Sequence, residues 1–289
     1  MRGLTYIQQK QISWAGRKRI ELFGSDGNKG AKTYTDTLDE NLFIPLYDTV
    51  RENFLTGDGG ELNASKPKKP KMHALHSSSA LGVNVFQYWM NKEDLSPILQ
   101  ACNLCNQGNN IKGKISFERK LPINSIFRFP PNIDVFIETE EHPNCKAYAV
   151  ECKFSEAYGS YKSIGLKEKY LNLDNSIWKD IPNIYKLSQQ ICPNDEMFRY
   201  LHPAQLIKHI LGLKRMYPKS KFRLLYLWYN VLGEEGYSHE HEISKFLSIA
   251  KKDKIQFHAI SYQELFVNLR NYFYNDNENY IDYLFDRYF

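Results

Sequence analysis

The sequence predicts an α/β protein in which a mixed central β-sheet is flanked by helices. Two segments rich in Val, Ile, Phe and Tyr, 132–138 and 147–154, are separated by a polar run with turn-forming residues, which is typical of an antiparallel hairpin. Residues 222–230 are apolar at almost every position and predict a central strand covered on both faces. Segments with helical spacing alternate with these strands, an order that is characteristic of α/β proteins.

The first helix of the series is expected over residues 78–90. Its apolar residues recur with helical spacing and can share one face: Leu81, Val85, Tyr88 and Trp89. A second helix is expected over 202–216, because Pro203 stands where the first turn of a helix accepts proline and an apolar stripe follows. These two helices precede and follow the hairpin in the chain.

Three further elements are expected after the apolar strand. A helix is predicted over 238–251 and a short strand over 255–260. Ser261-x-x-Glu264 has the pattern of a capping box and indicates the start of another helix. The order is therefore helix, strands, helix, strand, helix, strand, helix.

The sequence also suggests where the chain divides. Residues 1–64 form an N-terminal region of unknown role, which ends at a glycine-rich run and a Lys-Pro loop over 65–72. The remainder, 73–289, is expected to be the main domain. Within it, residues 171–195 are rich in Asn and Asp, contain two prolines, and are interpreted as an insertion.

Composition limits the class of protein. A chain of 289 residues is long enough to bury a substantial core without disulfide bonds. The five cysteines are an odd number, and no apolar run approaches a membrane span or a signal segment, so a reducing, cytoplasmic location is expected. The net charge of +5 permits nucleic-acid binding without requiring it. Basic runs at 17–19 and 65–71 could contact phosphates, or could be solvated surface.

The predicted hairpin carries the candidate active-site residues. Side chains alternate along a strand, so Glu151 and Lys153 point to one face, and the hairpin can bring Asp134 beside them. Two carboxylates and an ammonium would then meet at one place. The alternative is a cross-strand salt bridge on a solvated face, which is worth only ~0–1 kcal/mol.

An Asp on one strand followed by Glu-x-Lys on the next resembles the core motif of the PD-(D/E)XK nuclease superfamily. This resemblance implies a restriction-endonuclease-like core and a metal-dependent enzyme that hydrolyses DNA phosphodiester bonds, as an endonuclease rather than an exonuclease. Asp134 and Glu151 would hold Mg²⁺ or Mn²⁺ with the backbone carbonyl of Cys152, since hard cations prefer oxygen ligands. Lys153 would assist the attacking water. The proline of the family name is displaced, because Pro130 and Pro131 precede the aspartate by more than one residue.

The resemblance implies supporting residues as well. Glu118 is the upstream acid that would join the metal site, although it could equally be a surface glutamate. Gln205 on the 202–216 helix is the candidate for a glutamine that reaches the site in some branches; the alternative is a solvated side chain. The segment that begins at Ser78 is similar to one found in a bacterial subgroup, which places Asn84 or Ser78 near the site unless both simply belong to a capped core helix.

Two rival interpretations remain. A protein that keeps the nuclease fold could bind nucleic acid without cleaving it. A zinc site could form from two short pairs, although no zinc module has this order: His73, His76, Cys102 and Cys105. DNA is the expected partner, a homodimer is compatible with the resemblance because many relatives cleave as dimers, and protein partners are not indicated.

Overall fold

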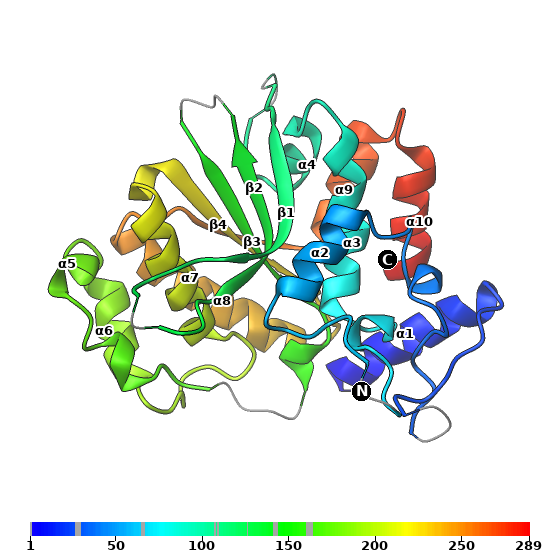
Figure 1. Cartoon of the computed structure of the whole chain (residues 1–289), viewed down its shortest axis with the longest axis horizontal. Helices are drawn as coiled ribbons and strands as arrows, with labels where there is room; N and C mark the ends of the chain where they lie inside the picture. Colours follow the sequence, from blue (N-terminus) through cyan, green and yellow to red (C-terminus); the bar gives the residue numbers. More distant parts are fainter. Residues whose placement is uncertain are drawn as a thin grey trace.

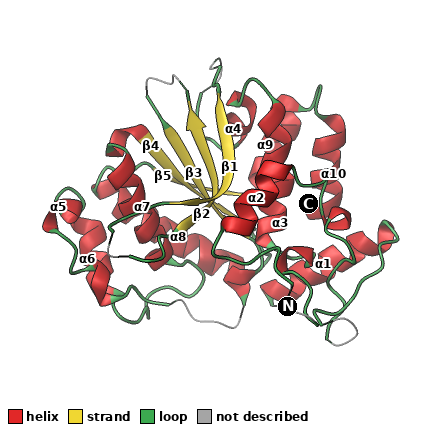
Figure 2. Cartoon of the chain, in the orientation of Figure 1, coloured by secondary structure: helices red, strands yellow, loops and turns green. Residues whose placement is uncertain are grey.

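The computed structural model describes residues 2–26, 30–64, 67–106, 108, 110–125, 127–140, 144–159 and 164–289. These residues form a five-stranded sheet in the spatial order β1-β2-β3-β4-β5 (Figure 2). The strands are β1 (Gly113–Lys120), β2 (Asn132–Thr139), β3 (Ala147–Lys153), β4 (Phe222–Trp228) and β5 (Phe257–Ser261). The pairs β1–β2 and β2–β3 are antiparallel, whereas β3–β4 and β4–β5 are parallel. The predicted α/β class with a mixed central sheet is confirmed.

Helices cover both faces of the sheet (Figure 1). One layer consists of α1 (Gly3–Arg17), α2 (Asp48–Thr56), α3 (Ser78–Phe86), α4 (Ser96–Ala101), α9 (Tyr262–Phe273) and α10 (Glu278–Tyr288). The other consists of α5 (Asn175–Trp178), α6 (Pro182–Gln190), α7 (Pro203–Met216) and α8 (Glu234–Lys252). Each layer encloses a hydrophobic core: Val150 and Cys152 face the first, and Ala149 faces the second. Glu151 and Lys153 therefore point toward the layer that contains α7.

The predicted elements lie close to their expected positions. The 78–90 helix is α3 followed by a 3₁₀ turn over Gln87–Asn91, and the 202–216 helix is α7. The 238–251 helix begins earlier than predicted, at Glu234, because Gly233 with φ of 89° provides the sharp turn before it. The helix start predicted at Ser261 is confirmed, since the Ser261 hydroxyl accepts the backbone N–H of Glu264 at 3.1 Å, while the Glu264 carboxylate accepts a hydrogen bond from Asn103 at 3.1 Å.

The N-terminal region contributes to the core of the sheet domain. Residues on α2 and before it share one core with β2 and β3, and α1 lies beside α10. Arg287 on α10 is almost fully buried, and its guanidinium donates to the Asn41 carbonyl at 2.8 Å and to the Gln11 side-chain oxygen at 3.0 Å. Its charge also lies 4.2 Å from the Trp14 ring. These contacts tie the two ends of the chain together.

The two basic runs are largely paired within the protein. Arg17 and Lys18 both contact Asp286, at 3.1 Å and 3.0 Å. In the Lys-Pro loop, Lys69 and Lys71 pair with acidic side chains at 2.9 Å and 3.5 Å, while residues 65–66 lie outside the described part of the chain. Residues 171–195 contain α5 and α6, which contact α7. None of the described helices is long and apolar enough to span a membrane.

A close approach at Gly212 sets the position of α7. A Cβ at Gly212 would lie 2.7 Å from both the Cβ and the backbone oxygen of Leu121, at the end of β1. Only glycine lets the helix come this near to the sheet. The helix carries Gln205 and His209, so this contact also determines where those side chains lie.

Gly212→Ala is expected to destabilise the fold by ~1–3 kcal/mol, because the added methyl group overpacks against main-chain atoms. The intrinsic helix preference for alanine, about 1 kcal/mol, acts in the opposite direction. Gly16→Ala in α1 is the matched control, since no atom lies within 4 Å of its added Cβ. Urea unfolding of both variants checks this, and equal stabilities would contradict the close-packing argument.

Candidate active site

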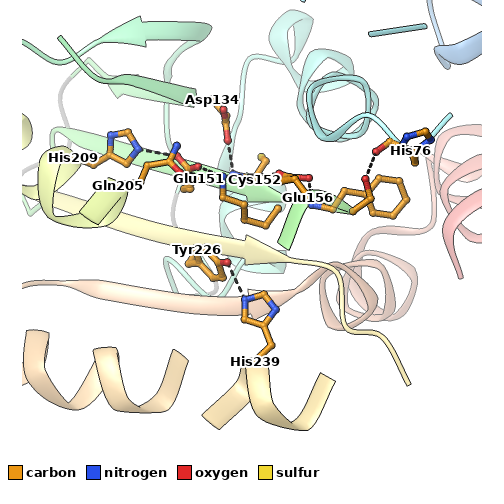
Figure 3. Close-up of polar contacts among 12 residues, drawn as sticks. His76, Asp134, Glu151, Cys152, Glu156, Gln205, His209, Tyr226 and His239 are labelled. Atoms are coloured by element: carbon orange, nitrogen blue, oxygen red, sulfur yellow. Dashed lines mark hydrogen bonds and ion pairs between the residues drawn. The ribbon is translucent and has the colours of Figure 1, made fainter. Parts of the chain in front are cut away.

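The antiparallel strands β2 and β3 part at the candidate site. Their ladder ends at the pair Val135 and Val150, and beyond it Asp134 Oδ2 accepts the backbone N–H of Cys152 at 2.7 Å (Figure 3). The Asp134 side chain thus replaces a ladder hydrogen bond. The N–H and C=O of one residue in a strand face the same neighbour, so the Cys152 carbonyl is directed to the same gap.

Glu151 and Lys153 form a buried ion pair. Lys153 Nζ lies 2.6 Å from Glu151 Oε1, and His209 Nε2 lies 2.8 Å from Glu151 Oε2. Burial alone would raise the pKa of Glu151, but the Lys153 ammonium and the His209 hydrogen bond outweigh it and lower that pKa. Burial disfavours the ammonium, yet Glu151, Glu156 and Asp134 together raise the pKa of Lys153. Both groups are therefore charged at neutral pH, and Lys153 acts as a fixed cation.

Helix α7 supplies two side chains that contact this pair. Gln205 Oε1 accepts a hydrogen bond from Lys153 Nζ at 3.1 Å, and His209 binds Glu151 (Figure 3). Gln205 and His209 are four residues apart, so they share a helix face. Of these two residues only Gln205 is predicted from the sequence, and its spacing of four residues to His209 is the signal that could have identified the histidine.

Glu118 has an unusual backbone conformation. It lies within β1 but adopts φ of 51°, and the strand register includes its neighbours Phe117 and Arg119 while omitting it. The left-handed region costs a non-glycine residue about 1–2 kcal/mol. The kink places the Glu118 carboxylate where Asn132 Nδ2 donates to it at 3.1 Å. Backbone strain of this kind is frequent at functional sites.

One cavity of about 820 Å³ lies over these residues. Acidic side chains lining it are Asp58, Glu61, Glu118 and Asp134. Residues of the opposite charge or neutral polar character also line it: Ser78, Lys167, Lys169, Gln205, Lys208 and His209. Glu151 and Lys153 are not among the lining residues, because Gln205 and His209 contact them from the cavity side. The predicted site residues are thus gathered, but two of them lie beneath the surface.

Asn84 does not belong to this group. It is buried in the core on the other side of the sheet, where its Oδ1 accepts the Phe43 N–H at 2.7 Å and its Nδ2 donates to the Tyr288 hydroxyl at 2.8 Å. Its expected place near the site is therefore wrong, and the alternative of a core helix residue explains it. Ser78, at the start of the same helix, does line the cavity.

Asp134 and Glu118 are the carboxylates at the cavity that could bind a metal ion. In the described part of the chain, no three or more His, Cys, Asp and Glu side chains are arranged to hold a metal ion, and this includes the His73, His76, Cys102 and Cys105 set. Mg²⁺, however, usually keeps several waters and binds one or two carboxylates together with substrate phosphates. Burial, together with the charge of Glu151, raises the pKa of Asp134. The donor chemistry at Asp134 and Glu118 fits such a cation.

In metal-free buffer, Glu118→Gln is expected to flatten the pH dependence of stability. Burial, with Glu61, Glu151 and Asp58 nearby, raises the pKa of Glu118 to about 7 from its ordinary 4.5, although Asn132 lowers it. Between pH 4.5 and about 7, Glu118 binds a proton in the folded chain that it has lost in the unfolded chain. The free energy of unfolding therefore falls as the pH rises through this range. Urea unfolding across this range tests it; an unchanged slope in the variant would contradict it.

Glu118→Gly is expected to be more stable than Glu118→Ala by about 1 kcal/mol. Both substitutions remove the carboxylate, but only alanine retains the left-handed strain of ~1–2 kcal/mol. Glycine's greater freedom in the unfolded chain offsets part of this difference, ~0.5–1 kcal/mol. Thermal unfolding of the two variants side by side provides the comparison, and an alanine variant of equal or higher stability would show that the kink relaxes.

Comparisons with known proteins give a single family. The model of the family described as "Restriction Endonuclease associating with ARP" matches residues 8–289. Searches of curated proteins and of solved structures found no significant match. The match spans the N-terminal region, the sheet and both helical layers, and the mixed sheet is consistent with a restriction-endonuclease-like core. The chain therefore belongs to this restriction-endonuclease-like family.

Proposed function

We propose that the chain is a metal-dependent nuclease of the PD-(D/E)XK type that cleaves DNA internally, in restriction or another form of DNA processing. The observation that carries this proposal is the convergence of Asp134, Glu151 and Lys153 on one sheet face, next to a cavity that also receives Glu118. Membership of a restriction-endonuclease family supports the nuclease class. The metal and the internal mode of cleavage rest on the motif alone.

The carboxylates of Asp134 and Glu118, which line the cavity, and the carbonyl of Cys152 would hold Mg²⁺ or Mn²⁺. Glu151 would join them once one of its oxygens leaves Lys153 or His209. When bound, the ion polarises the scissile phosphate and makes a bound water more acidic. Lys153 keeps its proton because of its pairing with Glu151, so it would donate a hydrogen bond to the attacking water or to a phosphate oxygen once Gln205 moves aside. Gln205 holds the Lys153 ammonium, and His209 fixes the orientation of the Glu151 carboxylate.

The family description also names association with ARP, and we extend this association to the chain as part of the proposal. DNA is the proposed substrate. A homodimer stays a prediction from the motif resemblance.

A second function has one observation in its favour. Glu151 and Lys153 are covered by His209 and Gln205 and do not line the cavity, which favours a protein that binds nucleic acid without cleaving it. Its binding surface would be the same cavity. Cleavage assays distinguish the two functions.

With Mg²⁺ or Mn²⁺, the natural protein is expected to cleave supercoiled plasmid or single-stranded DNA. Asp134→Asn and Lys153→Met are expected to reduce the rate at least ~100-fold, because the first weakens the binding of the cation and the second removes a positive charge that stabilises the reacting phosphate. Lys186→Met is the matched control: Lys186 is exposed on α6 and outside the cavity lining, so its rate should not change.

Three results would decide against the proposal. Activity that survives both site substitutions would place the active site elsewhere. Cleavage in EDTA would remove the metal requirement. Binding of DNA without cleavage in every metal and substrate tried would establish the second function.

A further inference from the structure

The cavity has a basic side that the proposed chemistry does not use. Lys208 extends from α7, and Lys167 and Lys169 come from the segment around the 3₁₀ turn Glu168–Tyr170. The ion pairs found among the described residues include none of these three lysines. Three lysines therefore line one cavity, and none of them has a carboxylate of the described residues at ion-pair distance.

The lysines lie close enough to affect one another electrostatically. Burial lowers the pKa of Lys208; Glu151 opposes this, while Lys167, Lys153 and Lys169 lower it further. A half-buried ammonium surrounded by other cations is stabilised when an anion binds beside it. A phosphate group, with its several charged oxygens, is such an anion.

The segment that carries Lys167 and Lys169 is anchored to the protein. The Leu166 N–H donates to the Ile191 carbonyl at 3.1 Å, and a Cβ at Gly165 would lie only 2.2 Å from the Pro193 oxygen. Lys169 Nζ lies 4.8 Å from the centre of the Phe127 ring. The backbone that carries Lys167 and Lys169 is therefore fixed beside the cavity before any ligand arrives, which reduces the entropy that binding would cost.

Two further features of the cavity indicate a nucleic-acid strand. On the acidic side, Asp58 and Glu61 pair with Lys120 and Lys71 at 3.3 Å and 3.5 Å, whereas the three lysines on the basic side form no ion pair among the described residues, so a sugar-phosphate backbone is favoured along these lysines. Phe129 and Ile164 also line the cavity, and they are 64% and 78% exposed. Exposed aromatic and apolar faces beside a basic groove are the surfaces on which unpaired bases stack.

We propose that Lys167, Lys169 and Lys208 form a phosphate-binding subsite that holds the substrate strand at the phosphate next to the scissile one, with an adjoining base against Phe129. The place of the scissile phosphate rests on the proposed nuclease function. Binding at the subsite does not, because it needs neither metal nor turnover.

The test measures binding without cleavage. Fluorescence anisotropy of a labelled oligonucleotide, single-stranded and duplex, is recorded in EDTA over a range of salt concentrations. Each phosphate contact contributes about 0.7 to 0.9 to the slope of log affinity against log salt. Lys167→Ala/Lys169→Ala/Lys208→Ala is therefore expected to lower the slope by about 2 to 3 and to weaken binding.

Two variants control for indirect effects. Lys186→Ala removes an exposed lysine from α6, outside the cavity, and should leave slope and affinity unchanged. Lys208→Arg, in a protein otherwise unaltered, should retain the slope that Lys208→Ala loses, because the cation remains. Matching unfolding midpoints would show that all variants are folded.

The possible results separate this inference from the nuclease proposal. A triple variant with the natural slope, or a natural protein that binds no oligonucleotide, overturns the subsite. Lysine-dependent binding by a natural protein that cleaves nothing overturns the nuclease and supports the subsite. If a mononucleotide or inorganic phosphate competes as strongly as the oligonucleotide, the lysines bind free phosphate and the assignment to a strand is wrong.

Discussion

The buried ion pair between Glu151 and Lys153 imposes the strongest constraint on this structure. Moving two charges from water into a protein interior costs several kcal/mol per ion unless further hydrogen bonds satisfy them. Here His209 and Gln205 supply those bonds from α7. These bonds require α7 to lie at one position on the sheet and at one rotation about its own axis. Gly212 permits the close approach to the sheet that this position needs.

Strands β1, β2 and β3 depart from regular geometry close to this ion pair. Beyond Val135 the ladder between β2 and β3 gives way to a side-chain contact from Asp134, and opposite this point Glu118 leaves the normal strand conformation. Regular sheet hydrogen bonding is thus interrupted on both sides of β2 at one level. Such interruptions lower local stability, and they are maintained where surrounding packing determines the geometry.

The two sides of the cavity come from distant parts of the chain. The acidic side includes Asp58 and Glu61, which precede the sheet, whereas the basic side comes from α7 and the segment before α5. The N-terminal contribution depends on the contacts of Arg287, because these join the first helix and the region around Asn41 to α10. A residue far from the cavity in space and in sequence thereby supports one of its sides.

The sequence by itself determined the hairpin and the side chains it presents. Alternation along a strand is a local property, so the common face of Glu151 and Lys153 follows from their spacing, and the apolar run at 222–230 marks a central strand. Helices α1, α2, α4, α5, α6 and α10 were not predicted. Asn84 was misplaced because helical spacing shows which residues share a face but not which neighbour that face meets.

Only the tertiary structure decided what surrounds the hairpin. The contact of His209 with Glu151, the left-handed conformation of Glu118 and the gathering of Lys167, Lys169 and Lys208 all join segments that are far apart in sequence. Local periodicity encodes which face of each element is buried. The crossing position of helix on sheet, and hence the partners of each charged group, arises from packing over the whole chain.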